Sequence, residues 1–225
     1  MNKSKGERLL QELYDNPEEF RNNGKTCQLL QEYFNGFSLE TLRDLLHSKE
    51  QPLRMVGVWI LSELGEDGSC LFEDIIPLLD EDNRYIRYHV LEIISVCATG
   101  ENTIKFVNIL PYMECGDEVI RNLVMRLVSN TDRLTFKIIA NTIKQNDSRL
   151  KLHYEGISKL VDIEKVSPEQ VILMLNDNEK LNRKYGVIMA KKLYKKYPSI
   201  IHEYVDSEDL DISRFSKEVI EVFSD

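Results

Sequence analysis

Apolar residues recur at intervals of three and four along almost the whole chain, and they seldom alternate with polar residues. This spacing is typical of amphipathic α-helices, whereas strands show a period of two. Glycine and proline are sparse, at 10 and 6 of 225 residues, so few positions break the helical pattern. The chain is therefore predicted to be all-α.

A basic residue followed three positions later by an apolar or small residue returns at a nearly constant interval. The intervals are 33, 34, 30, 32 and 31 residues, between Arg54, Arg87, Arg121, Lys151, Arg183 and Arg214. A shorter apolar segment precedes each of these positions, and a polar break such as DEDN or NDNE separates the two. Each unit is therefore predicted to be a helical hairpin.

Proline stands at matching places in two of the shorter segments, Pro77 in IIPLL and Pro111 in ILPYM. Because proline removes a backbone donor and kinks a helix, its recurrence in register supports a repeat. With these features the unit at residues 71–100 resembles the HEAT repeat. The resemblance covers residues 37–225 and is weakest in the fourth unit, where Gly156 is expected to interrupt the second helix.

The resemblance implies a right-handed α-solenoid of about six HEAT-like helical hairpins, forming one continuous domain over residues 1–225. Residues 1–36 are predicted to be N-terminal capping helices. The capping helices are expected to be interrupted at Asn16-Pro17. They are expected to end at Asn35-Gly36, where glycine suits a left-handed helix cap.

Charge is concentrated in the first half of the chain. The formal net charge is −9, and residues 1–100 carry 10 basic and 18 acidic side chains. This balance disfavours nucleic-acid binding, because phosphate backbones repel an acidic surface. Apolar runs of four to six residues are too short for a membrane span, and the amino-terminal segment lacks the apolar stretch of a signal peptide. We therefore expect a cytoplasmic protein, with no membrane partner.

The sequence lacks the common catalytic and metal-binding motifs. Neither GxSxG, HExxH nor a glycine-rich phosphate loop occurs, and the four cysteines form no CxxC pair. We expect no catalytic residue, no cofactor and no metal, and thus no enzyme. For His89, a hydrogen-bonded core position competes with a role as a general base.

Binding to a partner is the usual function of a solenoid, and in HEAT-like arrays the second helices usually line the concave face. The helical phase directs one set of residues to the core: Leu53, Gly57, Ile60, Leu61, Leu64, Ile86, Val90, Ile93, Ile94, Ile120, Val124, Leu127 and Val128. Positions between them point outward and predict a partner-binding patch of Met55, Trp59, Glu63, Glu66, Asp67, Tyr88, Glu92, Asn122 and Arg126. Aromatic anchors beside carboxylates suit a protein interface. Alternatively, Trp59 caps the core against the N-terminal helices.

A basic and aromatic segment follows in the fifth unit. Its cations are Lys180, Arg183, Lys184, Lys191, Lys192, Lys195 and Lys196, with Tyr185, Tyr194 and Tyr197 between them. Such a segment can contact RNA or an acidic partner, although most basic runs are solvated faces.

The stretch at residues 24–65, which includes YFNGFSLETLRDLL and ends in WILSELG, resembles immunity proteins of bacterial polymorphic toxin and contact-dependent growth inhibition systems. The resemblance implies a non-catalytic protein, a monomer when free, that binds and neutralises a cognate toxin domain such as a tRNA-cleaving ribonuclease. A HEAT-repeat scaffold in another complex is the alternative. A HEAT-like DNA glycosylase is less favoured, because that class needs a positively charged groove.

Overall fold

The computed structural model describes residues 3–146 and 150–224. Over these residues the regular elements are fourteen α-helices and four 3₁₀ helices, with no strand, so the all-α prediction is confirmed. The backbone groups into two compact units, Met1–Thr99 and Gly100–Asp225, which we call unit 1 and unit 2. The single continuous domain stays a prediction.

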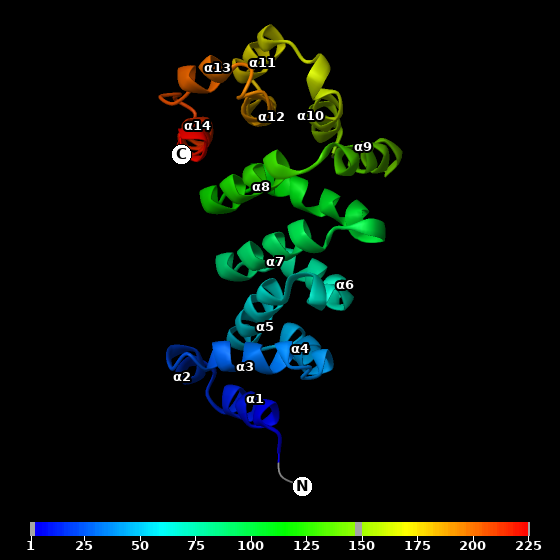
Figure 1. Cartoon of the computed structure of the whole chain (residues 1–225), viewed down its shortest axis with the longest axis vertical. Helices are drawn as coiled ribbons and strands as arrows, with labels where there is room; N and C mark the ends of the chain where they lie inside the picture. Colours follow the sequence, from blue (N-terminus) through cyan, green and yellow to red (C-terminus); the bar gives the residue numbers. More distant parts are fainter. Residues whose placement is uncertain (1–2, 147–149, 225) are drawn as a thin grey trace. The chain divides into compact units, whose positions relative to one another are not determined.

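Unit 1 is a succession of short helices (Figure 1). They are α1 (Lys5–Asp15), α2 (Pro17–Asn22), α3 (Lys25–Phe34), α4 (Leu39–Leu46), α5 (Gln51–Leu64), the 3₁₀ helix η1 (Gly65–Leu71), α6 (Phe72–Ile75), the 3₁₀ helix η2 (Ile76–Asp80) and α7 (Arg84–Cys97).

Helices α3, α5 and α7 pack side by side, and α4, α6 and η2 cover them as a second layer within unit 1 (Figure 1). Burial follows the predicted phase, because all the core-directed residues expected on α5 and α7 are buried. Polar side chains cap the starts of α1 and α7: Ser4 forms a capping box with Glu7, and Asn83 accepts the backbone N–H groups of Tyr85 and Ile86.

The N-terminal helices are interrupted and end where the sequence predicts. Helix α1 ends at Asp15, and the Asn16 side chain caps α2, whose first residue is Pro17. Helix α3 ends at Phe34, and Gly36 adopts a left-handed φ of 92°. A side chain at Gly36 would be strained by this backbone conformation, although space is free around it.

Both matching prolines lie in 3₁₀ rather than α-helical segments. Pro77 is near the start of η2, and Pro111 lies inside η3 (Gly100–Glu114). Proline supplies no N–H group to an α-helical ladder, which accounts for the break before η2. The shorter apolar segment that precedes Arg87 is therefore divided among η1, α6 and η2 and does not form one helix.

Unit 2 begins with η3 and contains the remaining elements. These are α8 (Glu118–Asn130), α9 (Arg133–Asn146), α10 (Lys151–Val161), the 3₁₀ helix η4 (Ile163–Lys165), α11 (Pro168–Leu175), α12 (Lys180–Lys192), α13 (Pro198–Glu203) and α14 (Leu210–Ser224).

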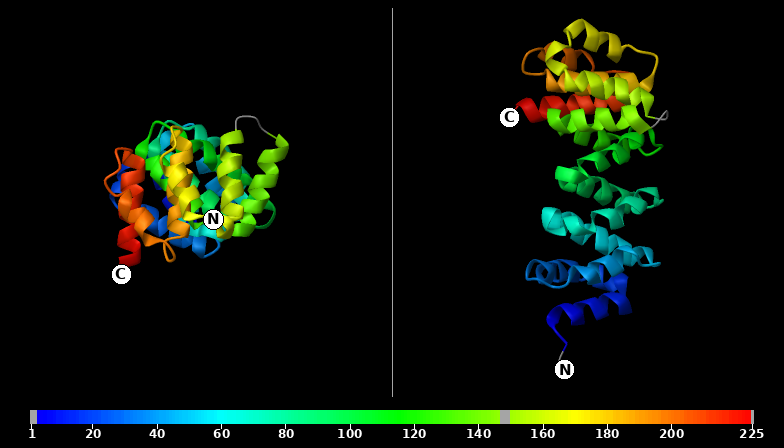
Figure 2. Two further views of the ribbon diagram at one scale, coloured as in Figure 1. Left: turned by 90° about the horizontal axis from the view of Figure 1, so that it is seen from above. Right: turned by 90° about the vertical axis from the view of Figure 1, so that its right-hand side faces the viewer.

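Helix α12 is the centre of unit 2. It contacts α8, α10, α11, α13 and α14, and Figure 2 (left) shows α14, α12, α10 and α9 side by side. Because α12 is covered on several sides, Tyr185, Val187 and Met189 are all buried. In a solenoid, each hairpin contacts only its neighbours in the chain, but α12 and α8 are separated by α9, α10 and α11. The contact of α12 with α8 is therefore not one that a regular array supplies, and the array of six repeats stays a prediction.

Three of the repeating arginines have a common structural role. Arg54, Arg121 and Arg183 each donate from Nη1 to the carbonyl oxygen six residues earlier, at 2.8 Å for Ser48, 2.9 Å for Cys115 and 2.8 Å for Asp177. Each also pairs with a later carboxylate: Glu81, Asp211 and Asp209, respectively, all at 2.8 Å. At these three positions the sequence period thus marks an arginine that joins a turn to another hairpin.

The predicted interruption at Gly156 is wrong. Helix α10 runs through this residue without a break. Glycine is present because the Tyr185 ring packs against it: a Cβ atom at this position would lie 2.3 Å from the ring carbons. The requirement at Gly156 is therefore space and not backbone conformation.

Candidate functional site

Helix α5 carries the first row of the predicted partner-binding patch. Met55, Trp59 and Glu63 are four residues apart, so they lie on one face of the helix. Met55 and Trp59 are partly exposed, whereas the flanking Val58 and Ile60 are fully buried. Glu63 is exposed. Trp59 is therefore partly exposed on the same helix face as Glu63.

Helix α7 carries the second row, and polar contacts join it to α5. Tyr88 and Glu92 are partly exposed. Between them, the Nδ1 atom of His89 lies 3.1 Å from the Ser62 hydroxyl of α5 and 3.3 Å from a carboxylate oxygen of Glu92. The His89 ring also packs edge-on against Tyr88. The structure thus brings the two rows together within unit 1.

The cluster of Ser62, His89 and Glu92 has the residue types of a hydrolytic triad but not its geometry. Both the hydroxyl and the carboxylate lie at Nδ1, whereas a triad places them on opposite ring nitrogens. Burial lowers the pKa of His89, which favours the neutral ring near pH 7. This geometry fits the structural alternative for His89.

Glu66 and Asp67 extend the patch where α5 ends. Both are exposed in η1. Burial, and then the charge of Glu66, raise the pKa of the Cys97 thiol, which donates to the Gly65 carbonyl oxygen at 3.4 Å. All seven predicted residues of unit 1 are partly exposed or exposed, and the end of α5 is acidic.

Sequence reasoning missed the residues that support Met55. The Arg21 guanidinium approaches Met55 Sδ at 3.9 Å and lies 5.8 Å above the centre of the Tyr85 ring. Asn83 Nδ2 approaches the same sulfur at 3.7 Å. Arg21 is outside the repeating pattern, so no periodic signal connects it with α5. We call the surface of Arg21, Met55, Trp59, Glu63, Glu66, Asp67, Tyr85, Tyr88 and Glu92 the acidic-aromatic face.

The two predicted residues in unit 2 behave differently from each other. Arg126 is exposed, as expected. Asn122 is only 7% exposed, so its outward position is wrong. The physical reason is that η3, α12 and α14 all pack on α8, which leaves little of that helix in solvent.

The basic and aromatic segment predicted in the fifth unit is exposed only in part, because two of its residues are buried. Lys184 and Tyr185 are 3% and 0% exposed. Lys191 donates to the Ser129 hydroxyl at 2.7 Å, and Lys192 donates to the Thr131 carbonyl oxygen at 2.8 Å. These lysines bind the carboxyl end of α8, where the helix dipole attracts cations. Lys195 and Lys196, beyond the helix, are exposed.

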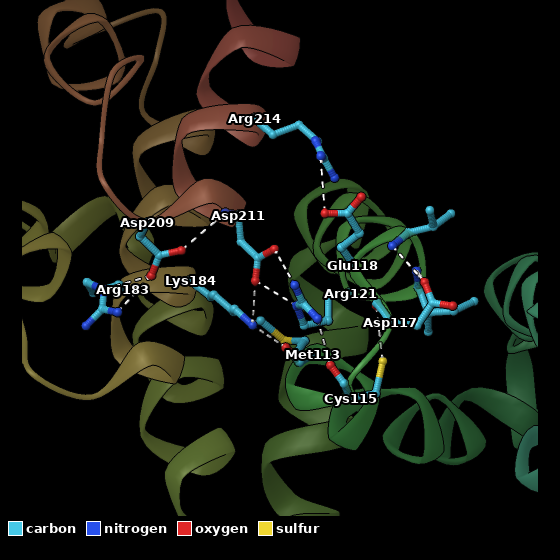
Figure 3. Close-up of polar contacts among 12 residues, drawn as sticks. Met113, Cys115, Asp117, Glu118, Arg121, Arg183, Lys184, Asp209, Asp211 and Arg214 are labelled. Carbon is cyan, nitrogen blue, oxygen red and sulfur yellow. Dashed lines mark hydrogen bonds and ion pairs between the residues drawn. The ribbon is translucent and has the colours of Figure 1, made fainter.

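A groove of about 600 Å³ in unit 2 contains ion pairs (Figure 3). Asp211 accepts from Arg121 at 2.8 Å and pairs with Lys184 at 3.1 Å, while Asp209 pairs with Arg183. Burial opposes the charged form of Asp211, but hydrogen bonds from Arg121 and Lys184 outweigh it and lower its pKa. These charged side chains pair with one another in the groove. Their ion pairs therefore join α14 to α8 and α12.

Within the described ranges, no group of three or more histidine, cysteine or acidic residues is arranged to hold a metal ion. None of the helices described is both long and apolar enough to cross a membrane. Comparison with protein-family models and with curated proteins finds no match to this chain.

Proposed function

We propose that this chain is a non-catalytic binding protein, an immunity protein that neutralises a cognate bacterial toxin domain in the cytoplasm. The observation that carries the proposal is the acidic-aromatic face of unit 1. There, the partly exposed Trp59 and Tyr88 lie among the carboxylates Glu63, Glu66 and Glu92. Aromatic side chains supply most of the energy of many protein interfaces, and surrounding charges select the partner.

A cationic toxin domain, such as a tRNA-cleaving ribonuclease, fits this face. Nuclease domains carry basic surfaces because they bind phosphate backbones, and residues 1–100 of this chain carry 18 acidic against 10 basic side chains. Opposite charge on the two proteins would accelerate their encounter. The HEAT-like character is part of the same proposal, because stacked helical hairpins offer an extended binding surface.

The test begins with the gene next to this one. If it encodes the carboxyl-terminal part of a large secreted protein, that terminal domain is expressed in bacteria with and without this chain. We expect growth arrest without the chain and growth with it, and a complex of the two purified proteins by calorimetry. A toxic neighbouring domain that this chain neither binds nor neutralises would contradict the proposal, and the scaffold alternative would then be favoured.

The face itself is tested with the variant Trp59→Ala/Glu92→Lys. Because it loses an aromatic anchor and reverses a charge, we expect the dissociation constant to rise by about a hundredfold or more. Helicity and thermal stability should be unchanged, since both side chains are partly exposed. Lost stability would instead assign Trp59 to the core, and unchanged binding would place the interface elsewhere.

A further inference from the structure

Unit 1 contains a second surface feature, an open groove of about 490 Å³ between the α3–α4 junction and the end of α5. Phe34, Phe37 and Leu39 contribute from the junction, and Leu64 and Asp67 contribute from the other side. Asp67 also belongs to the acidic-aromatic face, so the two features meet at this residue.

The groove presents apolar surface to solvent. Phe34, the last residue of α3, is 49% exposed. The Phe37 ring is partly exposed and packs 5.3 Å, centre to centre, from the Tyr33 ring. An exposed phenylalanine in a concave site is unfavourable in water, and covering it with another apolar side chain would recover the free energy of burial.

The backbone around the groove is well fixed. The buried Tyr33 side chain makes a hydrogen bond of 2.9 Å with the Thr41 hydroxyl, which ties α3 to α4. The chain turns between these helices at Gly36, whose φ of 92° suits glycine alone. A preformed site of this kind loses little conformational entropy when it binds a partner.

The charged groups of the groove are acidic. Its lining includes Glu40 and Asp67, both exposed, and no lysine or arginine. Glu40 pairs with Arg43, but Asp67 makes no ion pair with any residue that the structure describes. A cation placed beside Asp67 would therefore meet an uncompensated carboxylate.

We propose that this groove receives an apolar side chain flanked by lysine or arginine from a cationic protein partner. The inference rests on the proposed function and adds a second anchor to it, beside the acidic-aromatic face. A second copy of this chain is a poorer occupant, because two molecules that each carry a formal charge of −9 repel each other.

The groove is tested first without the toxin domain. The full-length protein, labelled with ¹⁵N, is titrated with the peptide acetyl-Lys-Lys-Phe-Lys-Lys-amide and followed by NMR. We expect saturable shifts of the Gly36, Phe37 and Leu39 amides with a dissociation constant below about 1 mM. The peptide with glutamate in place of each lysine should produce no such shifts. Equal shifts with both peptides, or none with either, would overturn the inference.

Matched variants separate the groove from general surface effects. Phe34→Ala and Asp67→Lys should each weaken peptide binding about tenfold. The controls are Leu173→Ala, which removes a leucine that is 71% exposed in unit 2, and Glu164→Lys, which reverses an exposed charge there. The controls should bind the peptide like the unchanged protein, and a similar loss in all four variants would overturn the inference.

The same variants distinguish this inference from the proposed function. A toxin domain that is neutralised normally by Phe34→Ala and by Asp67→Lys would retain the proposed function and overturn the groove as its anchor. A toxin domain that the unchanged protein fails to bind would overturn the proposed function, while peptide binding would still support the groove. Sedimentation that shows a dimer lost in Phe34→Ala would assign the groove to a second copy instead.

Discussion

His153 and Tyr185 form a buried pair in unit 2 that makes stability depend on pH. The Nδ1 atom of His153 lies 2.9 Å from the Tyr185 hydroxyl, and burial lowers the pKa of His153 to about 4. In the unfolded chain the imidazole has its ordinary pKa of 6.5. Between these two values the unfolded state binds more protons, so stability falls as the pH falls through this window.

We predict that His153→Gln reduces this pH dependence. Between pH 7 and pH 5 the unchanged protein should lose about 2 kcal/mol of stability through His153, on top of losses from its carboxylates. The variant should lack this component, although it is less stable at pH 7 if glutamine fills the site imperfectly. Urea unfolding at the two pH values measures the difference. An equal loss in both proteins would contradict the assignment.

The contact between Gly156 and Tyr185 gives a second prediction at the residue scale. Gly156→Ala places a methyl group 2.3 Å from the ring in the present geometry, so the buried tyrosine must move. Overpacking of this kind should cost about 2–3 kcal/mol, even though alanine favours a helix. Gly116→Ala is the control, because its new Cβ atom would have no neighbour within 4 Å. Thermal unfolding of both variants makes the comparison.

At the scale of the helix, two ion pairs join α8 to α14 in different environments (Figure 3). Asp211 holds Arg121 and Lys184 and is mostly buried, with its side chain 10% exposed. Glu118 and Arg214, in contrast, are 52% and 42% exposed. Solvent screens the second pair. Removing the carboxylate of the first leaves Arg121 and Lys184 with backbone carbonyl partners, at Cys115 and Met113, but without a counter-charge.

Asp211→Ala should therefore destabilise the protein by about 3 kcal/mol, and Glu118→Ala should change stability by no more than about 0.5 kcal/mol. Urea denaturation monitored by circular dichroism measures both values. Similar effects of the two substitutions would mean that the buried pair does not fasten α14. Restoring the stability of Asp211→Ala by adding Lys184→Met would support its role in compensating the buried lysine.

The elements that sequence periodicity predicted well are those with one buried face in the expected direction. The phase of α5 and α7 placed Leu53 and Ile86 correctly in the core and left Tyr88 partly exposed. The same reasoning failed for Asn122, and the basic segment was misjudged at Lys184, because α8 and α12 are covered on several sides. A helical pattern shows which positions share a face, but distant helices decide how many faces are covered.

The candidate site was predictable only where its residues follow the repeat. Trp59 and Glu92 are found by their phase on the second helices. Arg21 and Tyr85 were missed, because Arg21 comes from the N-terminal helices and reaches Met55 across 34 residues. The groove beside Phe34 was missed for a similar reason, since it forms only when the α3–α4 junction meets the end of α5.

At the scale of the whole molecule, charge is divided unevenly along the chain. Residues 1–100 have a formal charge of −8, whereas residues 101–225 carry 19 basic and 20 acidic side chains. If the acidic-aromatic face captures a cationic partner, the association rate should depend more on where the negative charges lie than on their total number. Charges near an interface act mainly on the association rate, and salt screens them.

We predict that Glu63→Lys/Glu66→Lys/Asp67→Lys slows association with the toxin domain by at least about tenfold at 50 mM NaCl and by much less at 500 mM. The control is Glu155→Lys/Glu164→Lys/Glu203→Lys, which changes the net charge equally at exposed positions of unit 2. Stopped-flow measurements give both rates. If the two triple variants slow association equally, net charge alone governs the encounter, and the face on α5 has no special part in it. If only the first variant is slow, the carboxylates at the end of α5 guide the partner to Trp59.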